Sequence, residues 1–191
     1  MNNKPIIIVN GEPNSIFLEI LFKSLKYKKF KSPLILISSS KLLKYYMKKF
    51  NYKKKINFIK YQQFDGKLLK NSINLIDVNY EGKPSFKKIS VKSNKFIQES
   101  FDIGLKTLKI FNSKKFINGP ISKKNFLDKK LPGITEYLAK KTKKHKFAML
   151  IFNEKLSVCP LTTHIPVKNI TKYISKKNIS EKVFLINSFY K

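Results

Sequence analysis

Short runs of branched apolar residues stand near the start of the chain, and each is bounded by polar or turn-forming residues. The first run occupies residues 5–10 and the second occupies residues 33–37. Unbroken apolar runs of this length, rich in isoleucine and valine, are typical of strands that are buried on both faces of a sheet. We therefore predict two buried strands at these positions.

Two amphipathic stretches, which predict helices, follow these runs. Apolar residues recur at helical spacing between residues 16 and 25, and Asn14 or Ser15 is a candidate N-cap for this helix. A serine cluster at residues 38–40 precedes a second, lysine-rich stretch at residues 41–50. Strands that alternate with helices of this length predict an α/β fold, in which helices cover both faces of a largely parallel sheet in three α/β/α layers.

The middle of the chain is less regular. Residues 54–92 contain short apolar pieces separated by turn signals, and the pattern assigns no element there. Helical periodicity returns at residues 96–111, and a further strand is expected at residues 115–118, directly before Gly119 and Pro120.

The last third predicts a pair of strands followed by helices. Residues 147–152 and 156–161 form two apolar runs joined by a short turn, and two helical stretches are expected after residue 167. Cys159 lies in the second run and is expected to be a small buried side chain of a strand. As the single cysteine, it cannot form an internal disulfide, which suits a reducing compartment.

Length and hydropathy predict a cytoplasmic globular protein. The chain has 191 residues, of which 42% are hydrophobic, enough for one sizeable core. The apolar stretch near the N-terminus is too short for a secretory signal, and no run is long enough to span a membrane.

The net charge of +30 raises the possibility of binding to nucleic acids or other polyanions. All 41 basic residues are lysines, however, and they are spread along the whole chain. Proteins that read bases usually place arginine where a planar, bidentate donor is required. We therefore expect solvated lysine faces with nonspecific adhesion to polyanions and no specific nucleic acid partner, although a basic polyanion-binding protein remains an alternative.

Three motifs in the second half occur together in one known family. They are NGPISK at residues 118–123, LPGITEYLA at 131–139 and LTTHIPVK at 161–168. The opening GEP at residues 11–13, together with Glu19, fits the start of the same family. In the order and spacing of these motifs the chain resembles the 4-hydroxythreonine-4-phosphate dehydrogenases, over nearly all of its own length but only over the N-terminal part of theirs.

The resemblance implies a fold like that of the isocitrate and isopropylmalate dehydrogenases, assembled as a homodimer. It also implies NAD and a divalent metal (Zn, Mg or Co) as cofactors and a phosphorylated small molecule as substrate. Members oxidise the 3-hydroxyl of 4-phosphohydroxy-L-threonine, and the resulting keto acid loses carbon dioxide. A divalent cation suits both steps, because it acidifies the hydroxyl and then polarises the new carbonyl.

The motifs assign three site residues by resemblance. His164 matches the family's first metal-binding histidine, and neutral imidazole is a good ligand for such a cation. Thr135 follows a Pro-Gly turn, where it could cap the next helix and contact the substrate phosphate. Lys123 is expected at the C-terminal end of a strand, as a second substrate-binding residue or as an ordinary solvated lysine. The other histidine, His145, reads as an exposed loop residue, and neither a catalytic base nor a cofactor-binding residue is assigned.

The chain departs from the family pattern at two places. Ile134 stands where the family has a histidine, and isoleucine cannot donate a hydrogen bond to a phosphate. In the opening loop, Ser15, Phe17 and Leu18 replace Gly, Gly and Pro, so the loop is expected to be reshaped. We therefore expect impaired or absent activity for this chain alone. A catalytically inactive remnant that acts as a binding or dimerising module is the alternative.

We treat residues 1–191 as one family-like region that lacks the family's C-terminal part. Such a chain is expected to expose strand edges and apolar surface, and hence to be poorly soluble or to assemble.

Overall fold

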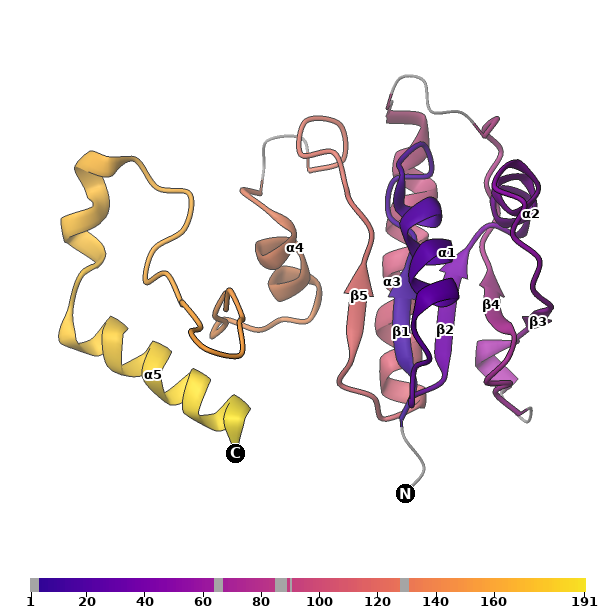
Figure 1. Ribbon diagram of the computed structural model, residues 1–191. Helices are drawn as coiled ribbons and strands as arrows, with labels where there is room; N and C mark the ends of the chain where they lie inside the picture. Colours follow the sequence, from indigo (N-terminus) through magenta and orange to yellow (C-terminus); the bar gives the residue numbers. More distant parts are fainter. Residues whose placement is uncertain (1–3, 64–66, 85–88, 90, 128–130) are drawn as a thin grey trace. The chain divides into compact units, whose positions relative to one another are not determined.

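The computed structural model describes residues 4–63, 67–84, 89, 91–127 and 131–191, which fall into two compact units (Figure 1). The first unit is Met1–Phe126 and the second is Leu127–Lys191. Each unit is described by itself.

The first unit is built on a sheet of five parallel strands, in the order β3-β4-β2-β1-β5. The strands are β1 (Ile6–Val9), β2 (Leu34–Ser38), β3 (Ile56–Phe58), β4 (Ile73–Asp77) and β5 (Phe116–Asn118). The predicted α/β fold with a parallel sheet is therefore confirmed. The strands expected at residues 5–10, 33–37 and 115–118 are β1, β2 and β5.

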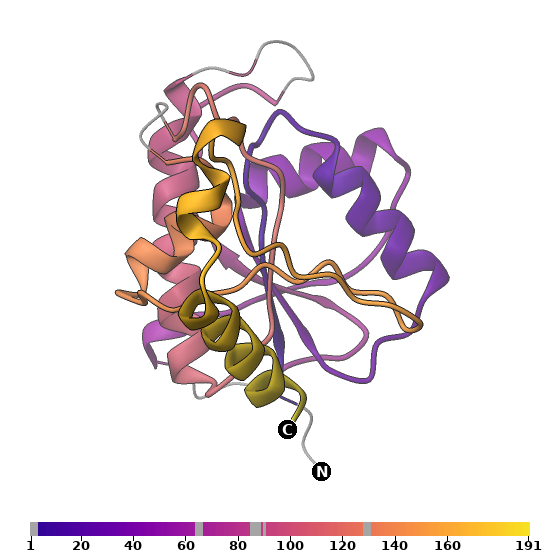
Figure 2. The ribbon, with the colours of Figure 1, turned by 90° about the vertical axis from the view of Figure 1, so that its left-hand side faces the viewer.

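Helices cover both faces of this sheet. The helices α1 (Phe17–Tyr27) and α2 (Ser40–Lys49) lie on one face, and α3 (Asn94–Ile110) lies on the other (Figure 2). Short 3₁₀ turns, η1 (Tyr61–Gln63) and η2 (Val91–Ser93), complete the elements described in this unit. The three predicted helices and the three layers are thus observed in the first unit.

The core lies between the sheet and these helices. Its centre consists of aliphatic side chains of the inner strands, such as Ile7, Ile35 and Leu75, each with an exposed fraction of 0%. Gly104 of α3 lies so close to the sheet that a methyl group on it would stand 2.7 Å from a methyl carbon of Val9. This close approach is possible because glycine has no side chain.

Two predictions about helix starts in this unit differ from the structure in detail. Neither Asn14 nor Ser15 is the N-cap of α1, because the cap position is taken by Ile16. The hydroxyl of Ser15 instead donates to the carbonyl oxygen of Glu12, at 2.7 Å, and so belongs to the preceding turn. The serine cluster does begin α2, but the capping acceptor comes from β4, where Asp77 accepts from the backbone N–H of Ser40 at 2.6 Å.

Strands β3 and β4 lie in the stretch to which the pattern assigned no element. Both contain an asparagine, which interrupts the apolar run. Asn74 is nonetheless buried, because its amide group donates to the carbonyl oxygen of Leu34 and its carbonyl oxygen accepts from the N–H of Leu69, both at 2.9 Å. A polar residue whose hydrogen bonds are satisfied by the backbone can lie inside a sheet. In the sequence, however, it interrupts the apolar run, and the segment then resembles a loop.

The described residues of the second unit form three helical elements: α4 (Ile134–Lys141), the 3₁₀ helix η3 (Val167–Tyr173) and α5 (Lys176–Tyr190). The two helical stretches expected after residue 167 are therefore confirmed. The strand pair expected before them is wrong, because only a single antiparallel bridge joins Ile151 and Val158. Both residues are about half exposed, so the described residues offer no apolar layer to bury a longer hairpin. Cys159 is half-buried and lies outside any strand, contrary to expectation.

Apolar side chains are prominent on the surface of the second unit. No residue of α5 is buried, and Val183, Phe184 and Phe189 have exposed fractions of 58%, 70% and 74%. The expectation of exposed apolar surface is thus met in this unit. Among the described residues, none of the helices is both long enough and apolar enough to cross a membrane.

Candidate functional site

Two loops meet at the carboxyl ends of β1 and β5, the edge where parallel sheets usually bind ligands. The N–H of Gly119 donates to the carbonyl oxygen of Val9 at 2.7 Å, and the N–H of Glu12 donates to the carbonyl oxygen of Pro120 at 2.8 Å. Gly11 has a φ of +69°, and a methyl group on Gly119 would overlap the backbone of Asn10. The two glycines therefore allow the backbones of the two loops to pack directly against each other.

A buried polar cluster lies beside these loops. Glu12 has an exposed fraction of only 2%, and its carboxylate accepts from the N–H of Asn14 at 3.4 Å. Burial raises the pKa of Glu12, and hydrogen bonds from Ser93 and from the Asn14 backbone partly oppose this shift. The pKa of Tyr80 is also raised, chiefly by burial. Sequence reasoning used Glu12 only as part of a motif and missed its burial, although a glutamate between Gly and Pro directly after a buried strand was the available signal.

Lys123 lies in the turn that follows β5 and is exposed. Ser122 shapes this turn, because its carbonyl oxygen accepts from the N–H of Phe126 at 2.9 Å and its hydroxyl accepts from the N–H of Asn125 at 3.1 Å. The lysine therefore stands after the C-terminal end of a strand, as expected, with its side chain in solvent.

In the second unit, the start of α4 carries Thr135. The N-cap residue is Gly133, with an extended backbone, and no side chain caps the helix. The expectation that Thr135 is the cap is therefore wrong, since Thr135 is half-buried and is the second residue of the helix. The carboxylate of Glu136 folds back over this start, and its Oε2 lies 3.0 Å from the position that a Cβ on Gly133 would occupy. A carboxylate at this position is favourable because the first N–H groups of a helix carry partial positive charge.

His164 lies at the same place. Its Nε2 is 3.7 Å from the position of a Cβ on Gly133, and the side chain is exposed. The preceding residue connects the two segments, because the hydroxyl of Thr163 donates to Oε1 of Glu136 at 3.3 Å. His164 also has a φ of +55°, a left-handed conformation that is uncommon outside glycine and is concentrated at functional sites. The fold of the second unit therefore brings His164 to the start of the helix that carries Thr135.

Comparison with known proteins places these motifs in one family. A family model described as "Pyridoxal phosphate biosynthetic protein PdxA" matches residues 29–191. The chain belongs to this family. Two curated relatives named 4-hydroxythreonine-4-phosphate dehydrogenase, from Aquifex aeolicus and Sulfurihydrogenibium sp., are 33% and 31% identical over 96% and 97% of this chain. These relatives confirm the family resemblance that the sequence motifs indicated.

Solved structures of PdxA-family proteins share the fold. A 4-hydroxythreonine-4-phosphate dehydrogenase from Klebsiella pneumoniae aligns with a TM-score of 0.83 at 20% identity, over 98% of this chain and 59% of that one. One from Burkholderia phymatum aligns with a TM-score of 0.78 at 19% identity, over 95% of this chain and 56% of that one. The chain spans 57% and 58% of the length of the two curated PdxA relatives.

The divalent metal that is expected from the sequence motifs can be compared with the donors that are present. Among the residues that the structure describes, no group of three His, Cys, Asp or Glu side chains could hold a metal ion. His145 is exposed and lies just beyond α4. Catalytic metal centres usually need three protein ligands. His164 near Gly133 therefore offers one ligand, and the described residues alone do not form a complete centre.

Proposed function

We propose that the protein takes part in the reaction of a 4-hydroxythreonine-4-phosphate dehydrogenase, the name that its curated relatives carry, and that this reaction is the NAD-dependent oxidation of 4-phosphohydroxy-L-threonine in pyridoxal phosphate synthesis. In this reaction C3 of the substrate transfers a hydride to NAD⁺ while the 3-hydroxyl loses a proton, and the resulting β-keto acid then loses carbon dioxide. Family membership supports the proposal. The observation that carries it is the position of His164, in a strained and exposed conformation at the start of the helix that bears Thr135.

Three residues receive roles in this proposal. His164 serves as one ligand of a divalent cation (Zn, Mg or Co), with the remaining ligands supplied from outside the described residues. Thr135 hydrogen-bonds the phosphate of the substrate, and Lys123 contributes a positive charge to substrate binding. Glu136 is a positioning residue, because its hydrogen bond from Thr163 holds the segment that carries His164 against α4.

Ile134 is expected to weaken phosphate binding. It is the first residue of α4 and is half-buried, and its side chain has no donor for a phosphate oxygen. Glu136 adds a negative charge at the same helix start. At this helix start the phosphate therefore depends on Thr135 and backbone N–H groups, so we propose a low affinity for substrate and slow or absent turnover by this chain alone.

A homodimer is the assembly that we propose for the cytoplasmic protein. The exposed side chains of α5, including Phe184 and Phe189, would be more stable when covered by a second copy. Light scattering coupled to gel filtration tests this assembly, and a stable monomer at micromolar concentration would contradict it.

Metal binding by the two histidines gives a test that does not need turnover. The full chain is titrated with Co²⁺, and the effect on each imidazole is followed by NMR. His164→Ala should abolish the tighter binding, whereas His145→Ala should leave it unchanged. Equal binding by both variants would contradict the role of His164.

Formation of NADH then separates the enzyme from the alternative. The chain is assayed with 4-phosphohydroxy-L-threonine, NAD and each of the three metals. Turnover that is lost in His164→Ala supports a dehydrogenase. The single imidazole at α4 and Ile134 favour the second candidate, a binding module without catalysis, which would show substrate binding without any NADH formation.

A further inference from the structure

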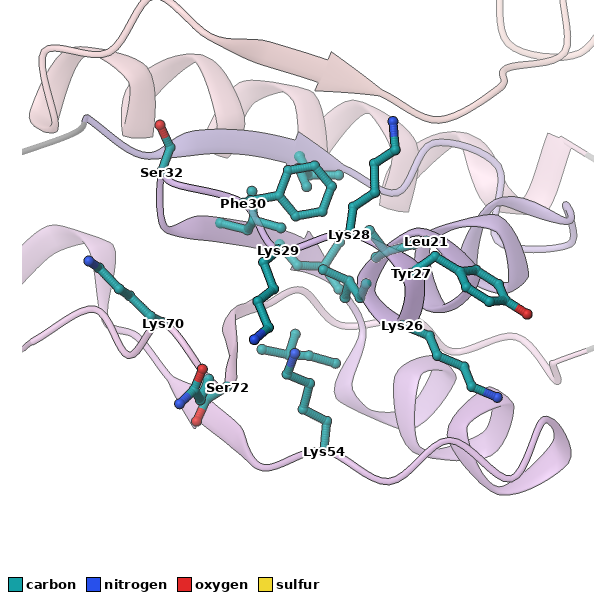
Figure 3. Close-up of a pocket in the computed structure, with 16 residues that line it drawn as sticks. Leu21, Lys26, Tyr27, Lys28, Lys29, Phe30, Ser32, Lys54, Lys70 and Ser72 are labelled. Atoms are coloured by element: carbon teal, nitrogen blue, oxygen red, sulfur yellow. The ribbon is translucent and has the colours of Figure 1, made fainter.

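A cavity of about 470 Å³ lies in the first unit, at the amino ends of the strands. Glu12 and Gly119 lie at the other end of the sheet, after the carboxyl ends of β1 and β5. Three parts of the chain surround the cavity: the last turn of α1, the segment of residues 28–32 that follows this helix, and the amino ends of β2 and β4 (Figure 3). A volume of this order is typical of sites that hold a small organic ligand. None of the motifs and none of the predicted site residues lies there.

The floor of the cavity is apolar. It is formed by side chains that are also part of the core, among them Leu21 of α1, Leu36 of β2 and Ile73 of β4. Phe30 adds an aromatic ring, with an exposed fraction of 41%, to the same lining. An apolar group of a ligand would therefore replace water against aliphatic and aromatic surface.

The rim of the cavity is cationic. Five lysines line it (Lys26, Lys28, Lys29, Lys54 and Lys70), and the lining contains no aspartate or glutamate. In the part of the chain that the structure describes, none of the five forms an ion pair with a carboxylate. These ammonium groups thus remain available to an external anion.

Two of these lysines are directed at the opening. Figure 3 shows the side chains of Lys29 and Lys54 extending toward one another, whereas those of Lys26 and Lys28 extend away from the opening. Lys54 is also half-buried. Two ammonium groups that converge without a carboxylate repel each other, and an anion between them relieves that repulsion.

We propose that this cavity binds a small organic anion that has an apolar body, such as an aliphatic or aromatic phosphate or carboxylate. The anionic group lies between Lys29 and Lys54, and the apolar body lies on the floor formed by Leu21, Leu36 and Ile73. A ligand that is polar throughout would leave this floor unused. The site is independent of the function proposed above, because it involves neither α4 nor His164.

Alkyl phosphates of increasing length test the proposal on the full chain. Butyl, hexyl and octyl phosphate are titrated below their micelle concentrations, with octanoate and inorganic phosphate in parallel. The affinity should rise by about fourfold for each added methylene until the cavity is filled. Inorganic phosphate should bind much more weakly than octyl phosphate, and binding of octanoate decides whether a carboxylate suffices as the anionic group.

A pair of matched double variants tests the rim. Lys29→Gln with Lys54→Gln should weaken octyl phosphate binding by about tenfold. Lys44→Gln with Lys48→Gln removes the same charge from the exposed face of α2, outside the cavity, and should change the affinity by less than twofold. Equal losses in the two double variants would overturn the proposal, since binding would then depend on net charge alone.

Amide chemical shifts locate the ligand. On addition of octyl phosphate, the largest changes should occur at residues 26–36 and 70–73. Changes concentrated at residues 147–191 would show that the alkyl chain binds the exposed apolar surface of the second unit, and would also overturn the proposal. An affinity for inorganic phosphate equal to that for octyl phosphate would do the same, because the floor would then contribute nothing.

Discussion

Replacing Gly119 by alanine should disrupt the junction between the loops that follow β1 and β5. The added methyl group would overlap the carbonyl group of Asn10, which is backbone and cannot rotate away as a side chain can. Relief requires one loop to move, and this movement would stretch the bonds that join Gly119 to Val9 and Glu12 to Pro120.

The magnitude follows from these contacts. Forcing one methyl group into a well-packed site costs about 1–3 kcal/mol. A weakened backbone hydrogen bond adds about 1 kcal/mol. Alanine also lowers the conformational entropy of the unfolded chain, which offsets about 0.4–1 kcal/mol of this loss. We therefore expect the free energy of unfolding of the first unit to fall by about 1–4 kcal/mol.

Gly133→Ala is the matched control. Its methyl group would meet only the ends of two side chains, Glu136 at 3.0 Å and His164 at 3.7 Å, and both can move. Gly133 is also the N-cap of α4, where alanine is less favourable than glycine, so the cost should be about 0.5–1 kcal/mol. Urea denaturation followed by circular dichroism, with hydrogen exchange of the β1 and β5 amides, measures both variants. If Gly119→Ala unfolds at the same urea concentration as Gly133→Ala, the backbone contacts do not hold the loops together.

Three further predictions concern carboxylates. Burial raises the pKa of Glu12 above its ordinary 4.5, so its contribution to stability is largest below pH 4.5 and is lost as the pH rises through the folded pKa. Glu12→Gln should therefore stabilise the protein at neutral pH and flatten the dependence of its urea midpoint on pH. Asp77→Ala removes the acceptor for the N–H and hydroxyl of Ser40 and should cost about 1–2 kcal/mol in urea denaturation, whereas Asp77→Asn should cost less. Glu136→Ala removes the acceptor for the Thr163 hydroxyl and should accelerate hydrogen exchange near residue 163, whereas Glu136→Gln should preserve the protection.

Each of these has an outcome that would contradict it. Glu99 is exposed, so Glu99→Gln is the control for Glu12→Gln. If the urea midpoint depends on pH in the same way in both variants, burial does not raise the pKa of Glu12. An Asp77→Ala variant as stable as the wild type would show that water caps α2 equally well. Unchanged exchange near residue 163 in Glu136→Ala would show that other contacts position the segment.

The elements that were predicted correctly from the sequence are those whose burial is uniform. The strands β1 and β2 are buried on both faces, so their residues are almost all branched and apolar. Helix α3 buries one face, and Phe96, Ile97 and Phe101 recur on that face at helical spacing. In both cases a single layer of contacts determines which residue types are allowed.

The elements that were missed depend on partners that are distant in sequence. Asn74 is buried in β4 because backbone groups of Leu34 and Leu69 satisfy its amide. Conversely, the apolar residues Ile151 and Val158 have the composition of strands but form only one bridge. A local pattern contains no information about either kind of partner.

The candidate site, too, could be predicted from the sequence only in part. His164 was identified by its motif, and the structure adds its left-handed backbone and its position near Gly133. The roles of Thr135, Lys123 and His164 stay predictions. The role of Glu136, which reaches back to the helix start and contacts Thr163, depends on two segments separated by 27 positions and could not be read from the sequence.

The position of β1 between β2 and β5 has a consequence for the order of folding during synthesis. Of the five strands of this sheet, the inner strand β1 leaves the ribosome first, and its second neighbour, Phe116–Asn118, is made only after the other three strands and after α1, α2 and α3. Until then one edge of β1 has no hydrogen-bonding partner and could pair with another nascent chain. We therefore expect that slowing translation between α3 and β5 would increase co-translational aggregation more than slowing it after residue 126.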